Sequence, residues 1–238
     1  MYAVKNKRCI LLKSDSKEEK MNKVRSTKIL TLMGVLIAIE MILSFTPLGF
    51  IPLVFMKATT LHIPVIIGAV LLGPIEGGIL GLVFGILSVI TNTTNPGLTS
   101  FVFSPFITIG GVSGNFASLV IAVVPRVLIG LTAYYSYRRL KQAQFSIRTK
   151  KHEIKLSEYA YEGAALVGAM TNTILVMGGI YLFFGQQYAA AKEVAFEALF
   201  GAIMGVVLLN GIPEAIVGAV IVGAVCKILN KVFIKGFN

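Results

Sequence analysis

Three charged residues, Glu40, Arg126 and Glu214, stand inside otherwise apolar segments of the sequence. Each lies 12 or 13 residues from a basic residue that bounds its segment, which along a helix corresponds to about 18 to 20 Å. Ionised groups at such a depth in a membrane are costly and normally pair or line a wet cavity. We therefore expect the three to meet as a buried charge cluster. The cluster is either purely structural or the floor of a cavity in which Arg126 also meets a carboxylate.

Two prolines and two amides accompany these charges. Pro125 and Pro213 directly precede Arg126 and Glu214, and a proline within a helix frees the backbone carbonyl one turn earlier. Asn172 lies within a later apolar segment, and Asn210 stands one turn before Glu214. An amide at this depth either bridges two helices or binds a polar ligand. The sequence leaves both readings open, and it makes Arg126, Asn172, Asn210 and Glu214 candidate substrate-binding residues.

The composition predicts a membrane protein. Of 238 residues, 55% are hydrophobic and only 14% are charged, with a mean hydropathy of +0.81, whereas a soluble chain carries about a quarter charged residues. The apolar residues fall into six segments, so we expect an all-α bundle of six transmembrane helices. The second and third segments are short for a full crossing. The six are residues 29–46, 58–73, 77–91, 116–137, 160–184 and 198–228.

The basic residues set the expected orientation of this bundle. An even number of spans places both termini on one side, and nineteen of the 22 Lys and Arg residues fall on that side. The positive-inside rule assigns that side to the cytosol. We read residues 1–25 as a basic cytosolic arm and residues 26–238 as the membrane domain. Because the net charge of +11 is confined to short segments, no nucleic-acid partner is expected.

The loop over residues 92–115 mixes amides, hydroxyls and aromatic rings, with Asn95 and Phe103 as further candidate substrate contacts. A loop this apolar predicts a lid that folds back over the mouth of the bundle. The alternative is an interfacial aromatic belt.

Signatures of enzymatic chemistry are missing from the sequence. There is no G-x-x-x-x-G-K-[ST] phosphate-binding loop and no G-x-S-x-G elbow. The only histidines are His62 and His152, and no His, Cys or Glu cluster has metal-ligand spacing. We therefore predict no catalytic residue, no metal, no cofactor and no ATPase activity of its own.

Small residues recur every four positions in two segments, at Gly34 and Ala38 and at Gly77, Gly81 and Gly85. Such a pattern leaves a bare helical face that another helix can approach closely. The face either packs inside the bundle or docks a partner subunit, and we expect at least one of the two to dock a partner.

Several motifs together resemble the substrate-binding S components of energy-coupling factor (ECF) vitamin transporters. The resemblance covers residues 29 to 230. Its motifs are His62-Ile63-Pro64-Val65-Ile66-Ile67-Gly68-Ala69, Leu72-Gly73-Pro74, Gly77-Gly78-Ile79-Leu80-Gly81-Leu82, the loop from Asn95-Pro96 to Phe103-Ser104-Pro105-Phe106, and Val124-Pro125-Arg126-Val127-Leu128-Ile129-Gly130.

This resemblance implies a multi-pass protein of a prokaryotic cell membrane that captures a vitamin-like small molecule. It further implies docking on a transmembrane T component that works with two cytosolic ATPases. In that family an Ala-x-x-x-Ala motif on the first helix meets the T component, and the matching residues here are Gly34 and Ala38. Among the subfamilies the chain is most similar to the pantothenate type, followed by those for pyrimidine or pyridoxine precursors. The residues alone also leave open a stand-alone channel or facilitator, and a membrane scaffold.

Overall fold

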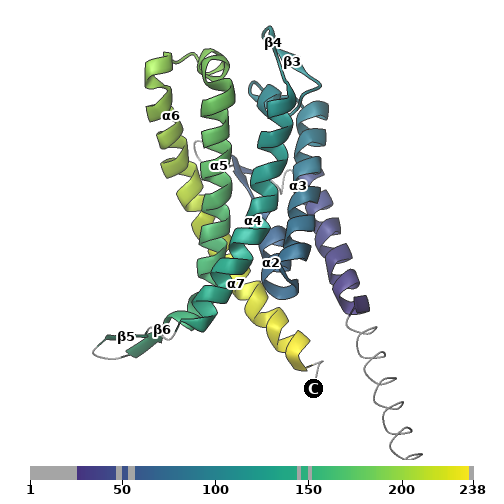
Figure 1. The fold of residues 1–238 in the computed structure, drawn as a ribbon, viewed down its shortest axis with the longest axis vertical. Coiled ribbons are helices and arrows are strands. Elements are labelled where there is room, and N and C mark those ends of the chain that lie inside the picture. Colours follow the sequence, from purple (N-terminus) through teal and green to yellow (C-terminus); the bar gives the residue numbers. More distant parts are fainter. Residues whose placement is uncertain (1–25, 47–49, 53–56, 144–145, 150–151, 236–238) are drawn as a thin grey trace, which may run out of the picture. The chain divides into compact units, whose positions relative to one another are not determined.

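The structure is a computed structural model that describes residues 26–46, 50–52, 57–143, 146–149 and 152–235. The chain divides into two compact units, Met1–Val35 and Leu36–Asn238. The described part of the first unit, from residue 26, is helical. The second unit is a bundle of helices with three short hairpins (Figure 1).

Helices make up most of the described chain. A first helix covers Ser26–Phe45. The others are α2 (His62–Leu72), α3 (Pro74–Thr94), α4 (Phe116–Gln142), α5 (Ala160–Ala191), α6 (Leu199–Val206) and α7 (Ile212–Lys235), with a π-helical segment η5 (Val207–Gly211) between the last two and 3₁₀ turns η2 (Ser100–Val102), η3 (Leu156–Tyr159) and η4 (Phe196–Ala198).

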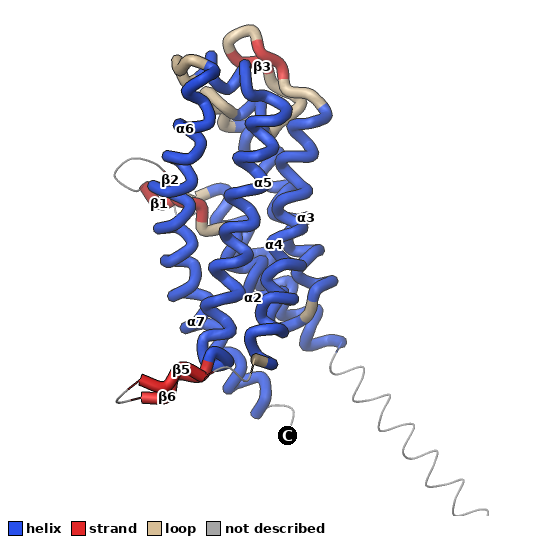
Figure 2. Tube along the Cα trace, turned by 60° about the vertical axis from the view of Figure 1, so that its left-hand side comes forward, coloured by secondary structure: helices blue, strands red, loops and turns tan. Residues whose placement is uncertain are grey.

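Three two-stranded antiparallel hairpins join the helices where the sequence suggested only loops. Figures 1 and 2 show β3–β4 at one end of the second unit, and β5–β6 at the opposite end together with the end of α7. We call these the β3–β4 end and the β5–β6 end. The strands are β1 (Phe50–Pro52) with β2 (Lys57–Thr59), β3 (Thr108–Ile109) with β4 (Val112–Ser113), and β5 (Ser146–Thr149) with β6 (His152–Lys155).

Five described helical segments are long and apolar enough to cross a membrane: Ser26–Phe45, Pro74–Thr94, Phe116–Gln142, Leu156–Ala191 and Phe196–Lys231. The all-α membrane class is therefore confirmed. The expected second span is the exception, because α2 has only 11 residues and rises about 16 Å against a hydrocarbon core of about 30 Å. The third span was expected to be short, and that was wrong, since α3 has 21 residues.

Glycines set the close approach of α3 and α4. A Cβ added at Gly81 would lie 2.8 Å from the Cα of Val127, and one added at Gly85 would lie 2.9 Å from the Cα of Val123. Where the helices cross, a Cβ on Gly130 would meet the backbone of Gly77. The helices therefore touch backbone to backbone, as small residues at every fourth position allow.

The loop between α3 and α4 folds back into the bundle, as its composition predicted. Phe101 and Val102 of η2 are buried in a core cluster with residues of α4, α5 and α6. The hydroxyl of Ser118 donates to the carbonyl of Phe101 at 2.7 Å, and the hydroxyls of Thr93 and Ser104 lie 2.7 Å apart. These bonds hold the loop on the ends of both helices.

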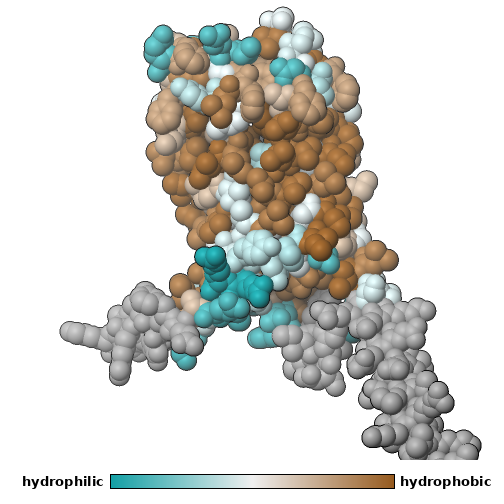
Figure 3. All heavy atoms as spheres, viewed as in Figure 1, coloured by the Kyte–Doolittle hydropathy of each residue, from teal (hydrophilic) through white to brown (hydrophobic). Residues whose placement is uncertain are grey.

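The surface of the second unit agrees with a membrane location. The face of the bundle seen in Figure 3 is predominantly apolar along its length, and polar residues gather toward its two ends. Many large apolar side chains face outward, among them Leu182, Leu209 and Val220. In water such a surface would favour association, whereas in lipid it is the expected exterior.

Candidate functional site

Arg126 is a buried cation on α4, with only 7% of the residue exposed. Its Nη1 donates to the carbonyl of Ile121 at 2.6 Å. The guanidinium carbon lies 5.4 Å from the ring centroid of Phe84 and 5.2 Å from that of Phe103. Its Nε is buried and has no hydrogen-bond partner among the described residues. Buried guanidinium donors are normally satisfied, so Arg126 has a donor to offer to a ligand.

Glu214 is a carboxylate in the first turn of α7. The hydroxyl of Thr59, at the end of β2, donates to its Oε1 at 2.7 Å. Nδ1 of His62, at the start of α2, lies 3.3 Å from the same oxygen. The His62 side chain is 2% exposed and that of Glu214 15%, so the carboxylate retains an open side. Among the described residues Glu214 forms no ion pair with Arg126.

Arg126, Asn172 and Glu214 lie at about one level of the bundle. Helix α5 packs against both α4 and α7, and its contacts with each of them fix their register. Interpolated between these contacts, Arg126 and Glu214 both fall within about one helical turn of the level of Asn172. The contacts are Ile121 with Gly179 and Ala133 with Gly168 between α4 and α5, and Thr173 with Gly211 and Glu162 with Gly223 between α5 and the η5–α7 segment.

Asn172 and Asn210 are two further polar residues near this level. Oδ1 of Asn172 is buried and accepts no hydrogen bond from the residues that the structure describes. Asn210 is buried within η5. Pro213 has no N–H to donate to the carbonyl of Leu209. The amide of Ile212 donates to the carbonyl of Val207, five residues earlier, rather than four residues earlier as in an α-helix. Such π-segments are frequent at functional sites.

The structure corrects the expected charge cluster at Glu40. This residue is fully buried, and neither carboxylate oxygen has a hydrogen-bond partner among the described residues. It lies on the face of the first helix that packs inward, between Leu36, which reaches Gly68 of α2, and Ser44, which shares a hydrogen bond with Thr91 of α3. Among the described residues no hydrogen bond or ion pair joins Glu40 to Arg126 or Glu214, so equal depth did not bring these side chains into one cluster.

The two candidate residues from the long loop have different surroundings. Phe103 is half-buried and its ring lies beside Arg126. Asn95 is exposed at the C-terminal cap of α3, where its backbone amide donates to Thr91. Only Phe103 is therefore next to the buried cation.

The small-residue faces also separate into two kinds. Gly77, Gly81 and Gly85 are buried against α4, and this corrects their expected docking role, because a face covered by α4 is not open to a partner. Gly34 and Ala38 are exposed on the first helix. Ala38 lies on the side opposite the inward residues Leu36 and Glu40.

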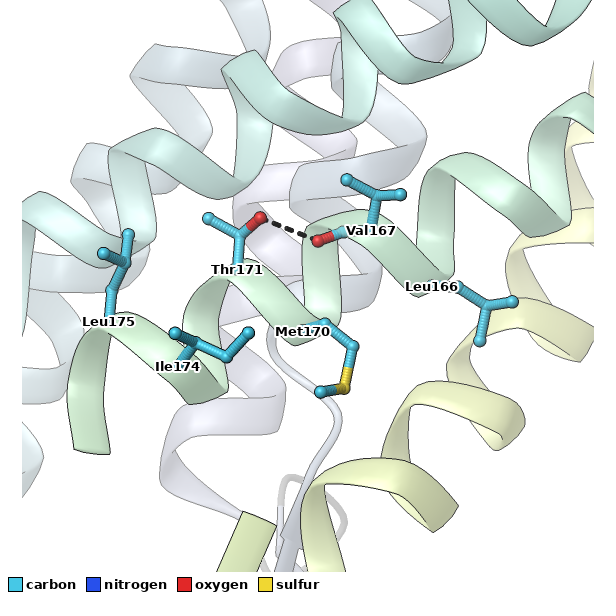
Figure 4. A pocket seen from close by; sticks show the side chains of 6 residues that line it. All are labelled: Leu166, Val167, Met170, Thr171, Ile174 and Leu175. Carbon is cyan, nitrogen blue, oxygen red and sulfur yellow. Dashed lines mark hydrogen bonds between the residues drawn. The ribbon is translucent and has the colours of Figure 1, made fainter. Parts of the chain in front are cut away.

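A shallow hollow of about 470 Å³ lies on the outward face of α5 (Figure 4). Its one polar side chain is Thr171, whose hydroxyl donates to the carbonyl of Val167 in its own helix at 2.7 Å. An apolar, wide-open hollow suits a lipid chain and offers nothing to a charged solute. The lining residues are Leu166, Val167, Met170, Thr171, Ile174 and Leu175.

Three site residues were not among the sequence candidates: Thr59, His62 and Phe84. His62 opens a run of apolar residues, and a lone histidine or phenylalanine there gives no signal of a site. Only the packing of the folded chain places Thr59 and His62 beside Glu214, and Phe84 beside Arg126. In the described chain no group of three His, Cys, Asp or Glu side chains is placed to hold a metal ion.

Comparison with known proteins decides the family. Residues 28–226 match the family model described as ECF transporter, substrate-specific component. This chain is an ECF S component. It is 36% identical over 176 residues to the pantothenic acid transporter PanT of Lactococcus lactis subsp. cremoris (strain MG1363), covering 74% of this chain and 79% of that protein. It is 26% identical over 218 residues to the pantothenate transporter PanT of Leuconostoc mesenteroides subsp. mesenteroides, covering 87% and 93%.

Family membership and the apolar helices make this S component a multi-pass membrane protein and a transport subunit rather than an enzyme.

Proposed function

We propose that this S component captures pantothenate for an ATP-driven ECF importer. The observation that carries the proposal is Arg126, a buried arginine with an unpartnered Nε beside a half-buried aromatic loop residue. Pantothenate is a small acid, and a guanidinium is the side chain best suited to bind a carboxylate with directed hydrogen bonds. The two similar proteins that are named pantothenate transporters support the same substrate.

The surroundings of Arg126 favour a ligand over a structural ion pair. An isolated buried charge is costly unless hydrogen-bonded partners compensate it. Here a hydrogen bond to the carbonyl of Ile121 and the faces of two aromatic rings compensate it in part. A bound carboxylate completes the compensation, so this site is suited to an anionic ligand.

The partners proposed are a transmembrane T component and two cytosolic ATPases, as is general for ECF S components. In this chain the exposed small residues Gly34 and Ala38 on the first helix are the proposed docking face. An exposed alanine flanked by the apolar side chains of Val35 and Ile42 permits close helix packing in lipid.

We further propose that both termini are cytosolic and that the protein resides in the plasma membrane of a prokaryote. The β5–β6 hairpin, within the basic region after α4, lies at the same end of the bundle as the C-terminal part of α7 (Figure 1). The positive-inside rule supports assigning that end to the cytosol.

Titration calorimetry on the purified chain in detergent tests the substrate. Pantothenate is expected to bind one to one, with pyridoxine and a pyrimidine precursor binding at least tenfold more weakly. Preferred binding of one of the latter two would reassign the substrate. Net pantothenate flux into liposomes that hold this chain alone would instead favour a facilitator.

A further inference from the structure

Glu214 is held through one of its two oxygens only. Both of its close contacts, the Thr59 hydroxyl at 2.7 Å and His62 Nδ1 at 3.3 Å, are made with Oε1. Among the described residues none hydrogen-bonds to Oε2 or forms an ion pair with it. The carboxylate is thus oriented by its neighbours while one strong acceptor stays available on its open side.

The imidazole ring of His62 packs beside this carboxylate and against α7. A Cβ added at Gly218, one turn along α7 from Glu214, would lie 2.8 Å from Nε2 of the imidazole. The ring is therefore packed flush against the backbone of α7, and only a glycine at position 218 leaves room for it. Thr59 acts as a positioning residue, because its hydrogen bond sets the direction of the Glu214 carboxylate, whereas the His62 ring packs beside the same oxygen without a hydrogen bond.

Three polar groups with complementary needs occur at one level of the bundle. Arg126 has an unpartnered donor in Nε, Asn172 has an unpartnered acceptor in Oδ1, and Glu214 has a free acceptor in Oε2. Buried polar atoms left without partners are uncommon in folded proteins. A ligand with an anion at one end, an N–H in the middle and a hydroxyl at the other end satisfies all three.

Pantothenate has these groups in this order: a carboxylate, an amide N–H and a pair of hydroxyls. We propose that Glu214, positioned by Thr59, accepts a hydrogen bond from a ligand hydroxyl, while Arg126 binds the carboxylate and Asn172 accepts from the amide. This assignment rests on the proposed function, and it specifies which group of the ligand each residue binds. Specificity against other small acids then comes from Glu214 rather than from Arg126.

Three ligands distinguish contacts to the carboxylate end of pantothenate from contacts to its hydroxyl end. Pantothenate carries both; N-(3,3-dimethylbutanoyl)-β-alanine keeps the carboxylate and amide but lacks both hydroxyls; panthenol keeps the hydroxyls and replaces the carboxylate with an alcohol. Dissociation constants are measured by calorimetry for the full chain and for Glu214→Gln, Thr59→Val and Arg126→Lys. Thr132→Val is the matched control, because the Thr132 hydroxyl bonds only to carbonyls of its own helix.

Glu214→Gln is expected to weaken pantothenate and panthenol tenfold or more and the hydroxyl-free acid less than twofold, since hydrogen bonds to a charged group are the strong ones. Thr59→Val is expected to show the same selectivity with a smaller loss of about threefold. Arg126→Lys is expected to weaken the two acids alike and to leave panthenol unchanged. Thr132→Val is expected to change none of them.

Equal losses for pantothenate and the hydroxyl-free acid in both Glu214→Gln and Thr59→Val would overturn the assignment, as would unchanged pantothenate binding in Glu214→Gln. Either result leaves the proposed function intact, because the wild-type chain still binds pantothenate. Failure of the wild-type chain to bind pantothenate overturns the proposed function itself. If Glu214→Gln does not fold, Thr59→Val decides, because it keeps the carboxylate and removes one hydroxyl.

Discussion

Arg126 donates a hydrogen bond of 2.6 Å to the carbonyl of Ile121, and this carbonyl is the one that Pro125 leaves without its helical donor. In an unbroken helix the amide of residue 125 bonds to the carbonyl of residue 121. Proline has no N–H, so the guanidinium of the next residue takes that place. The proline thereby ties down one arm of the arginine and directs the rest of the side chain toward Phe84 and Phe103.

Replacing this proline tests the coupling. In Pro125→Ala the backbone regains a donor for the Ile121 carbonyl, which then competes with Nη1 of Arg126. We expect pantothenate affinity to fall by about threefold to tenfold, the loss of roughly one net hydrogen bond, while the thermal midpoint stays equal or rises because helix propensity improves. Calorimetry and a thermal-shift measurement in the same detergent give the two values. An unchanged affinity would show that Pro125 does not position Arg126.

The glycines of α3 are predicted to govern stability rather than assembly. Gly81→Ala places a methyl group 2.8 Å from the Cα of Val127, so α3 and α4 must separate, at a cost of about 1 to 3 kcal/mol for overpacking. We expect a lower thermal midpoint and a lower yield.

Gly78→Ala on the same helix is the matched control, because a Cβ there meets nothing within 4 Å. If Gly81→Ala were as stable as this control and failed only to copurify with a T component, the α3 glycines would be a docking face after all.

Sequence patterns predicted the class of the main elements because long apolar runs report helices directly, but of the six expected spans only five are long enough to cross a membrane in the described chain. They did not predict where the helices end. Helix α5 continues past a kink at Phe184 as far as Ala191, since the Gln and Ala residues that follow favour helix without being apolar enough to signal a span.

Counting residues predicted similar depths for Glu40, Arg126 and Glu214, and the register of the helices supports this for Arg126 and Glu214. The counting did not predict which way each side chain faces around its helix axis. Glu40 packs toward α2 and α3. Which side a residue faces depends on which helices pack together, and single-sequence patterns do not specify that. For the same reason, the sequence did not predict His62 and Phe84 as site residues.

The first helix is predicted to carry the docking face. Ala38→Leu adds a large side chain to an exposed position, so we expect copurification of the T component and ATPases to fall at least tenfold while pantothenate binding to the isolated chain changes less than twofold. Ala202→Leu, at an exposed position on α6, is the control and is expected to leave both unchanged. Joint loss of binding and assembly in Ala38→Leu would mean that the helix is altered within the bundle.

The orientation is tested by labelling single cysteines in a variant without Cys9 and Cys226. A membrane-impermeant thiol reagent applied to intact cells is expected to label Thr99→Cys, in the loop at the β3–β4 end, and to leave Ser146→Cys in β5 unlabelled. Permeabilised cells provide the control, in which both positions react. Labelling of Ser146→Cys but not of Thr99→Cys in intact cells would reverse the topology.

The most direct test of pantothenate capture is native mass spectrometry of the chain purified from cells in mild detergent. The account predicts one bound molecule per chain with the mass of pantothenate, retained by the wild type and lost or strongly reduced in Arg126→Ala. A different vitamin retained at the same stoichiometry, or pantothenate retained equally by Arg126→Ala, would contradict it.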